Sequence, residues 1–149
     1  MVLTIDIGNT NIKSALFDDN KLIEFVVHNG VESAVNYISN KKFRSAAICS
    51  VNPPAAKKLL EKLDQLKIPI FEANIKNKSN LKINYETPET LGMDRVCSAS
   101  GALEISSKEN LVKRDQYLLT IDFGTATTIN VVAFEGVFIG GLIAPGIQT

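Results

Sequence analysis

Two aspartates, Asp6 and Asp122, occupy equivalent positions in a short motif that occurs twice in the chain. The motif reads Thr-Ile-Asp-Ile-Gly-Asn-Thr at residues 4–10 and Thr-Ile-Asp-Phe-Gly-Thr-Ala at residues 120–126. Its glycine lets the backbone approach a ligand, and its small residues leave the N–H groups of a turn accessible. Such donors beside a carboxylate that can hold a metal ion suit the phosphates and magnesium of a nucleotide. Each copy taken alone could also be a plain Asp-Gly hairpin turn.

Apolar runs follow both copies, at 12–17 and 129–134, so each copy predicts a strand, a tight turn and a second strand. The aspartates are 122 − 6 = 116 residues apart, and Phe17 and Phe134 are 134 − 17 = 117 apart. This difference predicts that the second turn is one residue longer. Two phosphate hairpins that face one another across a cleft are typical of the actin, sugar kinase and Hsp70 superfamily, which this duplication resembles.

A third polar motif, Gly92-Met93-Asp94-Arg95, stands where a long polar loop enters a predicted helix. The arginine can clamp an anion with its planar fork of donors. The aspartate can accept the proton of a hydroxyl group as that oxygen attacks a phosphoryl group. The alternative is structural: an aspartate favoured in the first helical turn by the helix dipole, beside a solvated arginine.

The hydrophobic pattern predicts an α/β fold whose first part has the order β-β-β-α-β-α-β, a mixed sheet with helices on both faces. This order is also that of the ribonuclease H-like core of the superfamily. We expect a long loop after residue 72, a helix at 91–105, a charged linker at 106–116 and a second meander of strands. The predicted domains are 1–115, an actin-like ATPase domain with the substrate loop and helix, and 116–149, the first strands of a second, incomplete domain.

Composition excludes several classes of protein. Sixteen basic and sixteen acidic residues cancel, so no global field favours nucleic acid or a membrane as partner. The chain has no P-loop motif and no glycine-rich dinucleotide fingerprint, which argues against those two nucleotide-binding folds. We expect the single histidine, His28, on the surface, and it has no acidic or serine companion for a hydrolase triad. No apolar run is long enough to span a membrane and no basic leader is apparent, so we expect a cytoplasmic protein whose two cysteines are reduced.

Four motifs together resemble type III pantothenate kinase in their order and approximate spacing. They are the segments that begin at Asp6, Gly92 and Asp122, and Gly-Gly-Leu-Ile-Ala-Pro-Gly at 140–146. The resemblance implies ATP-dependent phosphorylation of the primary hydroxyl of pantothenate, the first step of coenzyme A biosynthesis. It also implies ATP with Mg²⁺ and a monovalent cation, K⁺ or NH₄⁺, as cofactors, and a homodimer whose substrate pocket is completed across the interface.

The resemblance assigns roles to individual residues. Asp94 matches the proton acceptor, and Asp122 matches the ligand of the monovalent cation. The positions that match phosphate binding are Asp6, Ile7, Gly8, Asn9, Thr10, Asn11, Ile12 and Lys13, with Asp6 near the Mg²⁺, and Gly124 and Thr125 in the second hairpin. The positions that match pantothenate binding are Tyr85, Gly92, Met93, Asp94 and Arg95, and the segment 140–146 matches a glycine-rich stretch near the adenosine.

Two other functions remain compatible with the same fold. One is a non-catalytic nucleotide-binding regulator, since some relatives are described as transcription accessory factors, and the other is a structural protein that assembles. Members of the family are longer than this chain, which lacks part of the second domain. We therefore expect that this chain alone catalyses little.

Overall fold

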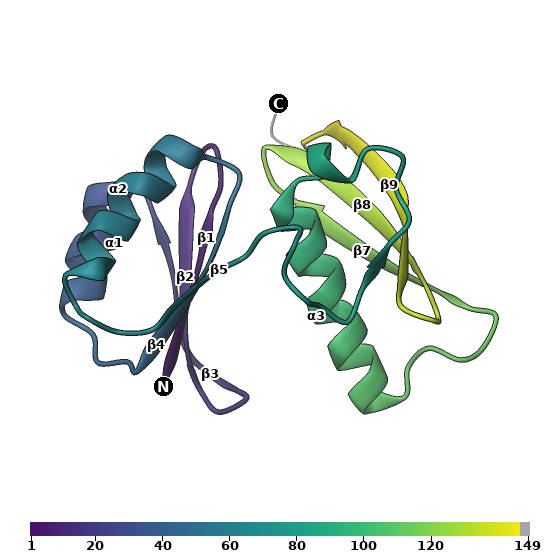
Figure 1. Ribbon diagram of the computed structural model, residues 1–149, viewed down its shortest axis with the longest axis horizontal. Coiled ribbons are helices and arrows are strands. Elements are labelled where there is room, and N and C mark those ends of the chain that lie inside the picture. The colour runs from purple at the N-terminus through teal and green to yellow at the C-terminus, as the bar shows by residue number, and fades with distance from the viewer. Residues whose placement is uncertain (147–149) are drawn as a thin grey trace. The chain divides into compact units, whose positions relative to one another are not determined.

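The computed structural model of the protein describes residues 1–146 and contains two compact units (Figure 1). The first unit is Met1–Asn74 and the second begins at Ile75. Each unit has its own sheet, of five strands in the first and four in the second. No helix in residues 1–146 combines the length and the apolar character that crossing a membrane requires.

The first unit begins with an antiparallel meander and continues with alternating helices and strands. Its elements are β1 (Val2–Ile7), β2 (Ile12–Asp18), β3 (Lys21–His28), α1 (Val31–Ser39), β4 (Ser45–Ser50), α2 (Pro53–Asp64) and β5 (Ile70–Glu72). The strand order is β3-β2-β1-β4-β5, with β1 antiparallel to β2 and parallel to β4. This order confirms the predicted β-β-β-α-β-α-β fold and its mixed sheet.

Both helices of the first unit pack on the same face of its sheet, as Figure 1 shows. Alternate residues of β1, namely Leu3, Ile5 and Ile7, are buried in one core with residues of α1 and α2. Because side chains alternate between the faces of a strand, Asp6 lies on the opposite face. The prediction of helices on both faces therefore does not hold within this unit.

The second unit combines a long helix with a second meander. Its elements are β6 (Lys82–Ile83), a 3₁₀ turn (Pro88–Thr90), α3 (Met93–Glu109), β7 (Tyr117–Phe123), β8 (Ala126–Ala133) and β9 (Val137–Pro145). The strands β7, β8 and β9 are consecutive antiparallel neighbours, as β1, β2 and β3 are, and β6 adds a short parallel strand beside β9. The recurrence of the meander agrees with the predicted start of a duplicated domain.

The compact units divide the chain earlier than the predicted domain boundary at 115/116. The buried stripe of α3, formed by Val96, Ala99 and Leu103, packs in one core with Val132 of β8 and Phe138 of β9. This shared core places the helix with the second sheet. Each Å² of apolar surface that is buried contributes about 25 cal/mol of stability, so such a core is the main source of a unit's stability.

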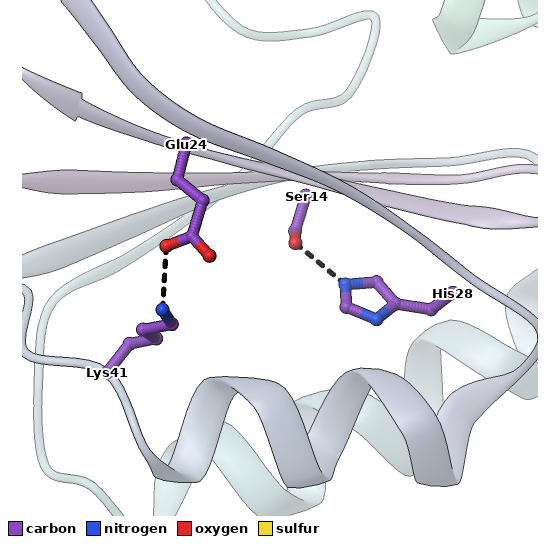
Figure 2. Close-up of polar contacts among 4 residues, drawn as sticks. All are labelled: Ser14, Glu24, His28 and Lys41. Carbon is purple, nitrogen blue, oxygen red and sulfur yellow. Dashed lines mark hydrogen bonds and ion pairs between the residues drawn. The ribbon is translucent and has the colours of Figure 1, made fainter.

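His28 is buried, with 2% of its surface exposed, and not on the surface as the sequence suggests. Its Nε2 lies 2.7 Å from Oγ of the buried Ser14, and its ring lies 5.1 Å from that of Tyr37. Figure 2 shows the Ser14–His28 pair near the ion pair between Lys41 and Glu24. The hydrogen bond from Lys41 lowers the pKa of Glu24. Burial lowers the pKa of His28 from its ordinary value of 6.5.

Acidification is therefore expected to destabilise the protein through His28. Because its pKa is lower in the folded state, the unfolded state takes up the proton first, and the free energy of unfolding falls as pH drops below 6.5. We expect a loss on the order of 1 kcal/mol between pH 7.5 and 5.5. Urea unfolding at both pH values measures it, and His28→Gln should flatten the dependence. A proton resonance of this single histidine that titrates at or above its ordinary pKa would contradict the prediction.

Candidate functional site

The first hairpin places Asp6 next to the end of β1, on the face of the sheet opposite the helices. Asp6 of β1 is the cross-strand partner of Lys13 of β2, and Nζ of Lys13 lies 3.9 Å from Oδ2 of Asp6. The turn of residues 8–11 is closed by a hydrogen bond of 3.1 Å from the N–H of Gly8 to the carbonyl of Asn11. A carboxylate, a lysine and an exposed turn thus occupy one end of the sheet.

The predicted phosphate-binding residues of this hairpin fall into two groups. Asn9, Thr10 and Asn11 are exposed on the turn. Ile7 and Ile12 point into the core, with 0% and 3% of their surface exposed. The two isoleucines can therefore offer only backbone groups to a ligand, and the Ile7 carbonyl already accepts a hydrogen bond of 3.1 Å from Val51.

The second hairpin repeats this arrangement with a shorter turn. Asp122 is next to the end of β7, and the N–H of Gly124 donates to the carbonyl of Ala126 at 3.1 Å. Asp6 and its cross-strand partner are 13 − 6 = 7 residues apart, whereas Asp122 and its partner Thr128 are 128 − 122 = 6 apart. The second turn is therefore one residue shorter, not longer. The prediction failed because Phe17 lies within β2 whereas Phe134 follows the end of β8.

Arg95, in the first turn of α3, is buried with 7% of its surface exposed. Its Nε donates to Oδ1 of Asn130 at 2.6 Å, and Nδ2 of Asn130 donates to Oγ1 of Thr120 at 2.9 Å. None of the ion pairs among residues 1–146 includes Arg95. Its Nη2 is buried and has no hydrogen-bond partner among these residues. The structural alternative of a solvated arginine is thereby excluded.

The buried ring of Phe138 contacts two of the predicted substrate residues. The Arg95 guanidinium carbon lies 5.7 Å from the centre of this ring, and the ring of Tyr85 meets it edge to face at 6.2 Å. Tyr85 is held there by β6, since the N–H of Asn84 donates to the carbonyl of Phe138 at 3.0 Å. The structure thus brings Tyr85 and Arg95 to one ring although a loop separates them in the sequence.

Asp94 lies in the first turn of α3 next to Arg95. Its Oδ1 accepts a hydrogen bond of 2.8 Å from the backbone N–H of Arg95, which fixes the carboxylate at the helix N-terminus. The capping position itself is taken by Gly92, which has no side chain to satisfy the helical N–H groups. Asp94 can thus support the helix and still present a second carboxylate oxygen.

Asp122 shares one face of the second sheet with the residues that hold Arg95. Thr120 pairs with Asn130 and Asp122 pairs with Thr128, two residues further along each strand. Residues two apart on a strand point to the same face and are separated by about 7 Å. The Asp122–Thr128 pair therefore lies one step from the Arg95 network, between it and the turn.

Two adjacent glycines of β9 lie near the predicted substrate residues, Gly140 near Tyr85 and Gly141 near Arg95. A β-bulge leaves Ile139 unpaired, so that Phe138 and Gly141 oppose Val132 and Asn130 on the α3 face. Gly141 has a φ of +152°, and a β-carbon there would collide with the Ile129 carbonyl and approach Arg95 Nη2 to 2.9 Å. The start of the 140–146 segment thus lies beside the predicted pantothenate residues, whereas Gly146 packs against the carbonyls of Gly124 and Thr125.

Comparison with known proteins identifies the family. A family model described as type III pantothenate kinase matches residues 2–149. The chain belongs to the type III pantothenate kinase family. The type III pantothenate kinase 1 of Symbiobacterium thermophilum is 33% identical over 164 residues, which cover all of this chain. That of Syntrophus aciditrophicus is 34% identical over 99% of this chain.

The chain spans about 60% of the length of these type III pantothenate kinases. Among solved structures, the PPX-GPPA enzyme of Aquifex aeolicus is 12% identical, with a TM-score of 0.44 over 97% of this chain and 52% of its own. The family assignment depends on the sequence matches alone.

Two functional candidates in this family member, Asn130 and Thr120, were not predicted from the sequence. Both are buried, with 0% and 8% of their surface exposed, and both lie on strands beside the predicted arginine. The available signal was the polar Asn130 within the apolar run of β8, because a polar residue on the inner face of a strand needs a partner. The sequence could not show that this partner is Arg95.

The two glycines provide a matched test of the close packing around Arg95. Gly140 and Gly141 both have φ in the left-handed region, at +143° and +152°, but a β-carbon at Gly140 meets nothing closer than Tyr85 at 3.9 Å. We expect Gly140→Ala to cost about 1 kcal/mol of stability through backbone strain, and Gly141→Ala at least about 2 kcal/mol more through collision. Urea unfolding of both variants measures the difference. Equal losses would show that the contact with Ile129 and Arg95 is unimportant.

Proposed function

We propose that the full-length protein transfers the γ-phosphoryl group of ATP to the primary hydroxyl of pantothenate and produces 4′-phosphopantothenate. The observation that carries this proposal is the buried Arg95 guanidinium, whose Nη2 lacks a partner among the described residues. A buried cation without a counterion costs on the order of several kcal/mol, so the site suits an anion. The carboxylate of pantothenate fits the planar fork of an arginine.

Tyr85, Gly92, Met93 and Arg95 are proposed to bind pantothenate around the ring of Phe138. Arg95 is fixed by Asn130, and Tyr85 is fixed by the pairing of β6 with β9. Because both positions are set by buried contacts, the site is organised before the substrate arrives. Such preorganisation contributes much of the catalysis in phosphoryl transfer, which needs positioning and charge neutralisation more than covalent chemistry.

Asp94 is proposed to accept the proton of the pantothenate hydroxyl. As that oxygen bonds to the γ-phosphorus, the bond from phosphorus to the β,γ-bridging oxygen breaks and ADP leaves with the electron pair. The proton passes to the carboxylate of Asp94, one of whose oxygens is oriented by the Arg95 N–H. The helix N-terminus also favours negative charge at this place.

The two hairpins are proposed to bind the phosphates of ATP. The turn residues Gly8 to Asn11 with Asp6 and Lys13, and Gly124 with Thr125, bring polar and charged side chains and glycine backbone that a ligand can approach closely. Mg²⁺ would neutralise phosphate charge near Asp6. Asp122, next to the end of β7, is proposed to hold a monovalent cation such as K⁺ or NH₄⁺. Within residues 1–146, no three acidic, histidine or cysteine side chains come together as a metal site.

A homodimer and a cytoplasmic location complete the proposal. Both are carried over from the resemblance to the type III pantothenate kinase family. The non-catalytic alternative has no observation of its own in its favour.

Replacement of Asp94 should abolish turnover by the full-length protein. In a coupled assay with pantothenate, ATP, Mg²⁺ and K⁺, Asp94→Asn should lower kcat by about 10² to 10⁴, since the variant keeps the shape of the side chain but cannot accept a proton. Glu104→Gln on the same helix is the control, because Glu104 forms an exposed pair with Lys108. Turnover by Asp94→Asn at the level of the control would remove Asp94 from the reaction. No turnover by the wild-type protein would refute the proposed function.

Replacement of Asp122 should weaken the response to K⁺. The wild-type protein should be more active in K⁺ than in Na⁺ at equal ionic strength, and Asp122→Asn should remove most of that difference because it removes the anionic ligand. Initial rates across a K⁺ titration measure the effect, with Asp115→Asn, in the turn before β7, as the charge-matched control. A K⁺ response that survives in Asp122→Asn would contradict this assignment.

A further inference from the structure

We propose that Asn130, held by Thr120, is a positioning residue that fixes the Arg95 guanidinium without neutralising its charge. It thereby gives the substrate site its preference for a carboxylate over a neutral group. This inference rests on the proposed function, because it concerns the arginine assigned to pantothenate. It adds two residues that the family resemblance did not point out.

The hydrogen bonds determine how the Asn130 amide is oriented. Its Oδ1 accepts from Arg95 Nε at 2.6 Å, and its Nδ2 donates to Thr120 Oγ1 at 2.9 Å. Rotation of the amide by half a turn would set its N–H₂ group against the Nε–H donor, which leaves both donors unsatisfied. All three side chains are buried, so water cannot replace the lost bonds. Arg95, whose Nε–H can only donate, thus selects this orientation, and Thr120 holds the amide in it by accepting from its Nδ2.

The neutrality of Asn130 matters as much as its geometry. An aspartate in its place would have the same shape and would form a charge-assisted pair with Arg95. Because buried charges interact strongly, that pair would satisfy the guanidinium internally and reduce its attraction for a ligand. An amide satisfies one N–H of the guanidinium and leaves the positive charge uncompensated.

Three further observations show that nothing else among the described residues takes this charge. Arg95 is absent from the ion pairs of residues 1–146, and its Nη2 has no partner there. Its position in the first turn of α3 puts a cation at the positive end of the helix dipole. The Phe138 ring holds the guanidinium from one side but contributes no anion. The unpaired charge therefore remains for the substrate.

The direct test introduces the missing charge. Calorimetry should give dissociation constants of the full-length protein for pantothenate and for an analogue in which a neutral primary amide replaces the carboxylate. We expect Asn130→Asp to weaken pantothenate binding at least about 10-fold and to change amide binding less than about 2-fold. The coupled assay should show the same change as a raised KM, with kcat affected less. An equal effect on both ligands would reduce Asn130 to a structural role and overturn the inference.

A second pair of variants decides the matter if Asn130→Asp folds poorly. Thr120→Val keeps the shape of the side chain but removes the acceptor for Asn130 Nδ2, whereas Thr120→Ser keeps the acceptor. We expect Thr120→Val to weaken pantothenate binding several-fold more than amide binding, and Thr120→Ser to restore the wild-type preference. If Thr120→Val keeps the same carboxylate preference as Thr120→Ser and the wild type, the inference is overturned.

Ser100→Ala is the control for a general loss of stability. Ser100 anchors α3 to the preceding loop through a hydrogen bond with Asn80, away from Arg95. We expect this variant to unfold at lower temperature and to keep the carboxylate preference. A wild-type protein that fails to phosphorylate pantothenate would refute both proposals. Turnover by the wild type with an unchanged preference in Asn130→Asp and Thr120→Val would refute only this one.

Discussion

The buried Arg95 guanidinium, which forms no ion pair within residues 1–146, is the constraint on which the polar contacts of the second unit depend. Burial removes water from the guanidinium, and the start of a helix is an unfavourable place for a cation. The surrounding residues limit that cost by holding the group without cancelling its charge. The amide of Asn130 accepts one N–H, the ring of Phe138 lies against the planar group, and Gly141 leaves space beside Nη2.

The two hairpins have the same backbone arrangement but different neighbouring residues. Both place an aspartate next to the end of a strand and close the turn with a bond from the following glycine. Asp6 is paired with Lys13, on the side of its sheet that α1 and α2 leave uncovered. Asp122 instead shares a sheet face with Thr120 and α3. The same backbone motif thus places its aspartate beside a lysine in one unit and on the sheet face of a helix in the other.

Local features of the fold could be predicted from the sequence, whereas contacts between distant segments could not. The hydrophobic pattern predicted the element order of the first unit and the strands of the second meander, and both are present. The burial of His28 and the pairing of Asn130 with Arg95 depend on which elements meet, and no local pattern contains that information. The turn length was misjudged because Phe134 lies outside its strand.

The two-residue strand β6 links the loop before α3 to the core of the second unit. The Lys82 N–H donates to the carbonyl of Gly136, just before β9, and the N–H of Asn84, just after β6, donates to the carbonyl of Phe138. These bonds hold Tyr85 near a fully buried ring. The backbone of Tyr85 is therefore tied to the strand that carries Phe138. On heating, release of β6 from β9 should therefore accompany opening of the core of the second unit.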